Sequence, residues 1–220
     1  MRLVIPVLFL FLSVGTSQAQ NPPSYSETIQ VIAAKRAELV RQDANTEVVR
    51  AELISSMEML VQFWIGTRWA LGAPQTTTPQ QGKVNCGTFV GRILHDAGFV
   101  VNVKKLQRQP SQLIIKSFVG GSRVRKFSGA TMDRFLASVH KMGPGLFIIG
   151  LDFHVGFLLQ TEEDLRFIHA SFETETVVNE DAASAMPITS SGYRVVGKIL
   201  SPANIRSWLR GERIVVKGRW

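Results

Sequence analysis

The chain has a single cysteine, Cys86, and the residues around it suggest a nucleophile. It lies in the segment NCGTFVGRIL, after turn-forming residues and at the start of an apolar pattern with helical spacing. Unpaired N–H groups and the helix dipole at a helix N-terminus favour thiolate over thiol, so we expect a lowered pKa for Cys86. The small residues Gly87 and Thr88 would let a substrate carbonyl approach the backbone. A buried structural cysteine is the alternative interpretation.

A thiol nucleophile needs a base, which is most often a histidine. The chain contains four histidines. His95 lies too far along the helix expected after Cys86 to fold back to the thiol, and His140 lies near the end of another expected helix, where we expect a surface position. His154 and His169 are different, because both lie in segments with the composition of β-strands.

The geometry of paired strands predicts where the rings of His154 and His169 lie. If residues 161–164 form the loop between the two strands, Gln160 and Leu165, which flank the loop, pair with each other. The two histidines then share one face of the sheet as diagonal neighbours, ~7–8 Å apart at the backbone. Any loop of even length preserves this result and an odd one breaks it. Gly156 would leave room for the second ring. The alternative is two unrelated strand histidines.

Helical patterns come before β-rich segments along the chain, which favours an α+β fold over alternating α/β. A linker is expected over 20–26 and a loop over 72–83, whereas 100–130 shows no clear pattern beyond a loop at 120–122. Periodicity and end signals predict helices over 27–41, 45–64, 86–97, 130–142 and 201–211, and composition predicts strands over 146–151, 153–160, 165–178 and 193–200.

The N-terminus has the pattern of a signal peptide. Arg2 precedes an apolar run from Leu3 to Val14, and a small-x-small site ends at Ala19. The run is shorter than the ~20 apolar residues of a spanning helix, although an uncleaved anchor is the alternative. No cysteine follows it, so a lipid-modified N-terminus is not expected. We therefore expect an extracytoplasmic bacterial protein, periplasmic or secreted, with a signal peptide over 1–19, a linker and helical extension over 20–62, and a catalytic domain over 63–220.

The chain is strongly basic, with a net charge of +8 and an isoelectric point near 10.1. Outside the cytoplasm this charge indicates an anionic cell-wall polymer or a membrane surface as partner, while a generally basic soluble surface is the alternative. Nucleic acid is not expected, because no nucleic-acid motif accompanies the charge. Neither a metal cluster nor a phosphate-binding loop is visible, so no cofactor is expected. The basic residues form two local clusters, at Lys104, Lys105 and Arg108 and at Arg123, Arg125 and Lys126.

Four segments resemble, in the same order, motifs of the NlpC family of bacterial cell-wall cysteine peptidases, a compact branch of the papain-like fold. GTRWALGA (66–73) resembles the family's Gly-Thr-x-Tyr-x-x-Gly-Gly, and TPQQGKVNCGTFV (78–90) resembles the motif around its catalytic cysteine. FHVGFLLQ (153–160) resembles the strand that carries the general base. FIHAS (167–171) resembles the strand with the third polar residue.

This resemblance implies a role for each matched residue. Cys86 is the implied nucleophile, His154 the base and His169 the residue that orients the imidazole, while the backbone N–H of Cys86 supplies one oxyanion donor. The implied fold is α+β, with the nucleophile on a helix N-terminus packed against an antiparallel sheet. The implied reaction is cleavage of peptidoglycan stem peptides through a thioester, typically at the bond after D-glutamate.

Three residues near the implied oxyanion and substrate site depart from the family pattern. Asn85 replaces an Asp, Gly87 replaces a Ser, and Trp69 stands where the family has a Tyr. An indole N–H can still donate a hydrogen bond, with a different reach. The departures keep other functions open: a thioester acyltransferase, an amidase on another exported substrate, or a wall-binding module whose catalytic groups are unproductive.

Overall fold

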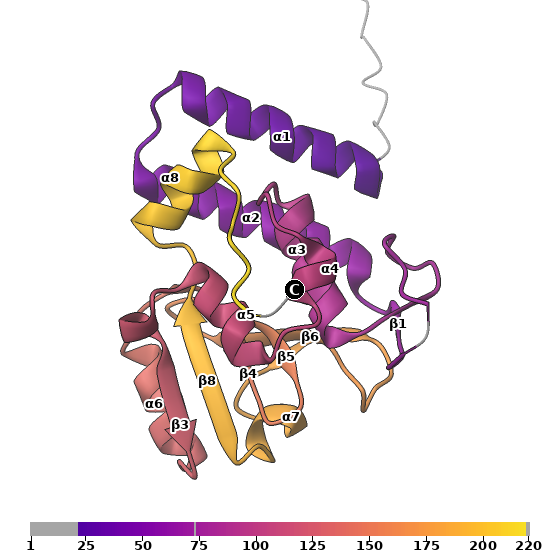
Figure 1. Cartoon of the computed structure of the whole chain (residues 1–220), viewed down its shortest axis with the longest axis vertical. Coiled ribbons are helices and arrows are strands. Elements are labelled where there is room, and N and C mark those ends of the chain that lie inside the picture. The colour runs from indigo at the N-terminus through magenta and orange to yellow at the C-terminus, as the bar shows by residue number, and fades with distance from the viewer. Residues whose placement is uncertain (1–21, 73, 219–220) are drawn as a thin grey trace, which may run out of the picture.

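The computed structural model describes residues 22–72 and 74–218, and its first elements are two antiparallel helices, α1 (Tyr25–Arg41) and α2 (Thr46–Trp64) (Figure 1). Ser24 caps α1 in a reciprocal capping box with Glu27, so the helix begins earlier than predicted and the expected linker is shorter. Both helices are confirmed. The expected signal peptide lies outside the described residues, and the expected domain boundaries stay predictions. No helix in the described ranges is long and apolar enough to cross a membrane.

The helix expected at the cysteine is confirmed as α3 (Cys86–Asp96), with Asn85 as its N-cap. Gly98 follows it with φ +95°, a conformation that glycine adopts at little cost. Before α3, the expected loop is flanked by two short strands that pair in parallel, β1 (Arg68–Trp69) and β2 (Lys83–Val84), the second of which begins at its last residue.

The segment 100–130, which shows no clear pattern in the sequence, contains four short elements. They are α4 (Val103–Leu106), α5 (Ser111–Phe118), the 3-10 helix η1 (Gly121–Arg123) and β3 (Arg125–Ser128). Only α5 has an amphipathic pattern that spans two turns, and its N-cap, Pro110, makes no side-chain capping bond.

The main sheet has six strands in the order β3-β8-β4-β5-β6-β7, and every neighbouring pair is antiparallel. The β-rich segment expected over 165–178 is two strands, because the chain turns over residues 171–176 and pairs back on itself. The remaining elements are β4 (Gly145–Gly150), β5 (Val155–Gln160), β6 (Leu165–Ala170), β7 (Val177–Asp181), β8 (Tyr193–Lys198), α6 (Met132–His140), α7 (Met186–Thr189) and α8 (Pro202–Arg210).

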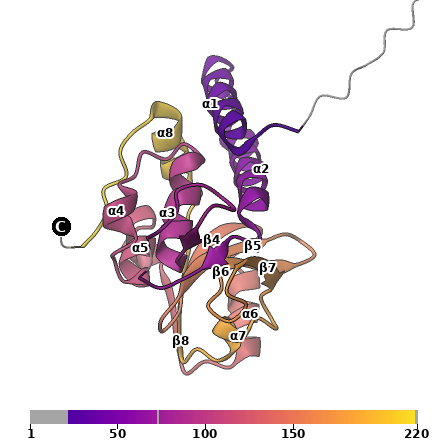
Figure 2. The same cartoon turned by 90° about the vertical axis from the view of Figure 1, so that its right-hand side faces the viewer.

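Both faces of this sheet are covered. In Figure 2, α3 and α5 lie on one side of it and α6 and α7 on the other. Alternate residues of each strand join different cores, since Ile148 and Phe157 pack with α3, whereas Phe147 and Leu158 pack with α6. The predicted α+β class is therefore confirmed, with the helix that begins at Cys86 packed against an antiparallel sheet.

A buried polar network joins the N-terminal helices to α3. The hydroxyl of Tyr25 on α1 donates to Asp96 at 2.6 Å and accepts from Nε1 of Trp64 at 2.9 Å. Asp96 is 4% exposed and also receives hydrogen bonds from Arg92 and His95. Burial and the nearby Asp96 raise the pKa of Tyr25. The helical extension is thus docked on the helix that carries the cysteine.

We predict that Tyr25→Phe lowers the free energy of unfolding by about 1–3 kcal/mol, because it leaves the buried Asp96 carboxylate with one donor fewer. Urea unfolding measures the change. Tyr193→Phe is the matched control: its half-buried hydroxyl forms a hydrogen bond with the side-chain amide of Gln112 rather than with a buried carboxylate, so a smaller loss is expected. Equal losses in the two variants would mean that the network does not hold the extension.

Candidate active site

Cys86 and His154 line the same cavity, which has a volume of about 300 Å³. Cys86 is half-buried on the first turn of α3, and His154 directly precedes β5, one residue before the strand in which it was expected. The cavity also contains Asn85 and Gly87, and its other lining residues are Leu71, Gln107, Gln109, Pro110, Ser111, Ile114, Leu151, Asp152, Phe153 and Val155.

The two strand histidines are in contact, as the strand geometry predicts. Gln160 pairs with Leu165 across the loop 161–164, and the rings share one face of the sheet. Nε2 of His154 and Nδ1 of His169 are 2.8 Å apart, and the ring planes are nearly perpendicular. The predicted role of Gly156 is supported, since a Cβ there would lie 2.8 Å from Cβ of His169.

A third ionisable residue, Glu180, extends the chain of contacts and was missed in the sequence. Its Oε1 lies 2.7 Å from Nε2 of His169. On β7, Val178 pairs with His169, so Glu180 is the diagonal neighbour on the same face. The strand rule that relates the two histidines would also have found Glu180, had residues 165–178 been divided into two strands.

These contacts define the tautomer of each ring. When Glu180 is ionised it accepts the Nε2–H of His169, so the neutral ring of His169 has a lone pair on Nδ1. That lone pair accepts the Nε2–H of His154. Nδ1 of His154 is then the unprotonated nitrogen, and no hydrogen bond within the described part of the chain uses it.

Both rings are neutral at physiological pH. Burial and the neighbouring His169 lower the pKa of His154 to about 3. Burial also lowers the pKa of His169 to about 3, although the Glu180 carboxyl lies beside it. The pair therefore rests uncharged, with one nitrogen of His154 free to accept a proton.

The pKa of Cys86 moves in the opposite direction from the one expected at a helix N-terminus. Burial raises the pKa of its thiol, and this outweighs the backbone N–H groups of Val155, Gly87 and Cys86 itself, which favour the thiolate. The expectation of a thiolate activated at rest is therefore wrong. Since His154 is also neutral, the resting pair is a thiol beside an imidazole.

Asn85 and Gly87 have structural tasks besides lining the cavity. The side-chain oxygen of Asn85 accepts the N–H of Thr88 at 2.8 Å and so caps α3. A Cβ at Gly87 would lie 2.8 Å from the carbonyl oxygen of Gln107. Glycine at this position is therefore required by the close approach of the chain after α4, while the approach of a substrate carbonyl to the backbone here stays a prediction.

Trp69 lies near the site without lining its cavity. Its ring packs 6.3 Å from that of Phe172, which in turn lies 5.7 Å from the ring of His154. The indole N–H is buried and has no hydrogen-bond partner within the described residues. An unpaired buried donor costs free energy, so this N–H has bonding capacity that the protein does not use. Its oxyanion role stays a prediction.

The two remaining histidines lie away from the cavity. His95 is exposed on α3, where Nδ1 is 2.8 Å from Asp96, and His140 is exposed at the end of α6. Both positions agree with the reasoning from the sequence. No group of three or more His, Cys, Asp or Glu side chains within residues 22–72 and 74–218 could hold a metal ion.

The part of the cavity lined by described residues is acidic rather than basic. Among residues 22–72 and 74–218, its lining includes Asp152 and no lysine or arginine. The carboxylate of Asp152 accepts the N–H of Gly192 at 2.8 Å and the hydroxyl of Ser191 at 3.1 Å, which fixes it at the rim. Phe153 beside it is 98% exposed. The rim thus presents an anion and an aromatic ring to any ligand.

Comparison with known proteins yields only distant matches. No protein-family model matches the chain, and no curated protein matches it. Two crystal structures of an N-acetylmuramoyl-L-alanine amidase from Bacteroides uniformis ATCC 8492 align with 64% of this chain and 96% of their own, at 12% and 13% identity and a TM-score of 0.36. At this level the similarity supports no conclusion about fold or function.

The buried histidine pair predicts a specific loss of stability in acid. Both pKa values are lowered on folding, so the unfolded chain binds more protons below pH 6.5, and stability present above that pH is lost as the pH falls towards about 3. Between pH 7 and pH 5 we expect a loss of about 2–4 kcal/mol from the pair. Urea unfolding at both pH values measures it.

The double variant His154→Asn/His169→Asn should have a weaker pH dependence over this range, whatever its stability at pH 7. His140→Asn, an exposed histidine on α6, is the control and should unfold with the dependence of the wild type. A double variant that keeps the wild-type pH dependence would show that the pair is not buried in its neutral form.

Proposed function

We propose that this protein is an exported cysteine hydrolase that cleaves an amide bond in peptidoglycan stem peptides through a thioester intermediate. The observation that carries the proposal is the buried hydrogen bond between His154 and His169 beside the cavity that contains Cys86. This arrangement leaves one imidazole nitrogen available as a base in the cavity that the thiol also lines, and acyl transfer to cysteine requires such a base. The motifs that resemble the NlpC family supply the substrate class.

In the first half of the reaction, the thiol proton of Cys86 moves to Nδ1 of His154 as the sulfur attacks the amide carbon. The pair rests neutral, so the proton moves during the attack and not before it. The negative charge that develops on the carbonyl oxygen is stabilised by the backbone N–H of Cys86. The carbon–nitrogen bond then breaks, and His154 gives its proton to the leaving amine.

In the second half, water resolves the thioester. His154, neutral again, takes a proton from water as the oxygen attacks the thioester carbon. The carbon–sulfur bond breaks, the thiolate recovers the proton from His154, and the carboxylic acid product leaves. Each half transfers one proton to the ring and one from it, so the same nitrogen serves as base and as acid.

His169 and Glu180 act through His154 rather than on the substrate. A proton arriving on Nδ1 makes the ring of His154 cationic, and the lone pair of His169 and the nearby carboxylate of Glu180 stabilise that cation. The low pKa of His154 at rest makes this stabilisation important, because the cation must form in a buried place. Both residues are positioning residues.

The proposed bond is the one after D-glutamate, as the resemblance implies. The cavity adds one constraint, because Asp152 at its rim favours a substrate with an ammonium group near the cleaved bond and disfavours an anionic group there. The exposed ring of Phe153 offers a face for an apolar or cationic portion of the substrate.

Incubation of the purified protein with peptidoglycan, followed by mass analysis of the muropeptides, tests the reaction and identifies the bond. We expect a mass gain of one water per cleaved bond. Transfer of an acyl group to an added amine, with no water gained, would identify a thioester acyltransferase instead. Binding to the wall without any product would identify an unproductive wall-binding module.

Cys86→Ala is predicted to abolish product formation while leaving the fold intact, because the change removes one half-buried sulfur atom. Circular dichroism and urea unfolding check the fold, and His140→Ala, which alters an exposed histidine at the end of α6, is the control and should keep full activity. Full activity in Cys86→Ala would disprove the proposed mechanism.

The loss of activity is predicted to be largest for substitution of His154 and smaller for substitutions of His169 and Glu180, which lie further from the thiol. His154→Asn removes the acid–base group and should lose about 10²–10⁴-fold in kcat. His169→Asn can keep one hydrogen bond to His154 and should retain more activity than His169→Ala. Glu180→Gln keeps a hydrogen-bond acceptor and removes the charge, so we expect about a tenfold loss.

The pH dependence of kcat/KM distinguishes the loss of a positioning contact to His154 from general damage to the structure. The acid limb of kcat/KM reports the protonation of His154 in the free enzyme, so it should lie well below pH 6.5 and move to still lower pH in Glu180→Gln. Glu173→Gln, the loss of a nearby exposed carboxyl group, is the control. If His169→Ala matches the wild type, His169 has no part in the reaction.

A further inference from the structure

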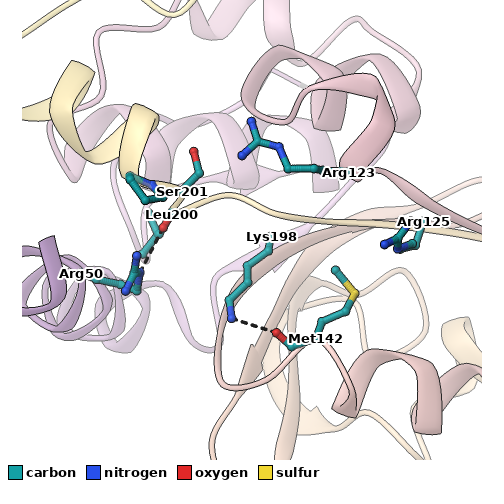
Figure 3. A pocket seen from close by; sticks show the side chains of 8 residues that line it. Arg50, Arg123, Arg125, Met142, Lys198, Leu200 and Ser201 are labelled. Carbon is teal, nitrogen blue, oxygen red and sulfur yellow. Dashed lines mark hydrogen bonds between the residues drawn. The ribbon is translucent and has the colours of Figure 1, made fainter.

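A second cavity, with a volume of about 390 Å³, lies between α2, the end of β8 and the start of α8. Figure 3 shows its side chains. It shares no lining residue with the cavity of Cys86. Its lining residues are Arg50, Arg123, Arg125, Met142, Lys198, Leu200, Ser201 and Pro202.

Four of these eight residues are cationic and none is acidic. The side chains of Arg123 and Arg125 are exposed, and neither forms an ion pair or a hydrogen bond within residues 22–72 and 74–218. Arg50 is paired with Glu47, which lies outside this lining. Two guanidinium groups therefore face the cavity with all their donors unused.

The other two cations retain donors as well. Lys198 gives two hydrogen bonds, to the carbonyl oxygens of Met142 at 3.0 Å and Gly143 at 3.2 Å, and its ammonium lies 5.6 Å from the ring centroid of Phe147. Its third N–H has no hydrogen-bond partner among the described residues. Arg50 donates Nε–H to the carbonyl oxygen of Leu200 at 3.1 Å, which holds its guanidinium at the cavity (Figure 3). Burial and the charge of Arg50 lower the pKa of Lys198. The positive charges of Arg50 and Lys198 therefore repel each other, and a bound anion would offset this repulsion.

The start of α8 adds a polar group at the same cavity. Ser201 is the N-cap, and its hydroxyl oxygen accepts the N–H of Asn204 at 3.3 Å. The hydroxyl hydrogen has no acceptor within residues 22–72 and 74–218. The positive end of the dipole of this nine-residue helix lies at the same place. Its contribution has the same sign as that of the four side chains.

We propose that this cavity binds a phosphate ester, a tetrahedral oxyanion held by Arg123, Arg125 and Lys198. Guanidinium groups match the oxygen geometry of phosphate with two parallel hydrogen bonds each, and several cations around one cavity suit an anion with three or four oxygens better than a carboxylate. The volume leaves space for the group esterified to the phosphate. This site is independent of the proposed hydrolase activity.

Binding of inorganic phosphate and of glycerol 3-phosphate to the full chain at low ionic strength, measured by titration calorimetry, tests the proposal. Arg123→Gln and Arg125→Gln should each weaken binding about tenfold, and the double variant about a hundredfold, because each loses a charge-assisted contact. The matched control is Arg134→Gln, an exposed arginine on α6 outside the cavity, which should change affinity less than twofold. Acetate should bind more weakly than phosphate.

Cosedimentation with phosphatidylglycerol vesicles distinguishes a lipid headgroup from a soluble phosphate ester as the source. Loss of either form of binding in the double variant, with the control unchanged, supports the site. The proposal fails if the double variant weakens binding no more than Arg134→Gln does, or if acetate binds as tightly as phosphate, since either result would reflect only the net positive charge. Measurement in the Cys86→Ala background keeps the result separate from hydrolysis.

Discussion

The hydrogen bond between His154 and His169 depends on the register of β5 against β6, and the rest of the site depends on that bond. The loop of residues 161–164 is closed by backbone and side-chain hydrogen bonds between Thr161 and Asp164, so the strands meet with an even number of residues between them. A slip of one residue would turn one ring to the opposite face. The four polar residues of a surface loop therefore determine whether the thiol has a base.

The same bond solves the problem of placing two polar rings in the interior. His169 is fully buried and stacks on Phe167 with 3.9 Å between ring centroids, so each of its nitrogens needs a partner. His154 and Glu180 supply them. Burial keeps both rings neutral, and the hydrogen bonds then determine which nitrogen of each ring carries the proton. Stability and the direction of proton transfer thus come from one set of contacts.

The sequence predicts the contact between His154 and His169, because this inference needs only the alternation of side chains along a strand and the length of the loop 161–164. Most of the longer helices are predicted from the sequence for a similar reason, since each has a capping side chain and an apolar face. These helices are α1, α2, α3, α6 and α8. Glu180 was missed because its strand was not separated from the preceding one: the turn at residues 171–176 contains no glycine or proline to mark it. The raised pKa of Cys86 was missed because burial depends on packing from β5, which helical position does not reveal.

The two cavities differ in charge, and the fold explains how a basic chain keeps them apart. The cavity of Cys86 lies where α3 meets β5, and none of the described residues that line it is a lysine or arginine. The second cavity lies at the end of β8, where α2, η1, β3 and β8 each contribute one cation. Arg50 reaches it from α2, which packs on the core and is joined to α1 and α3 through Tyr25, Trp64 and Asp96. The N-terminal helices therefore do more than cover the core, since they complete a concentration of positive charge that the sheet alone does not form.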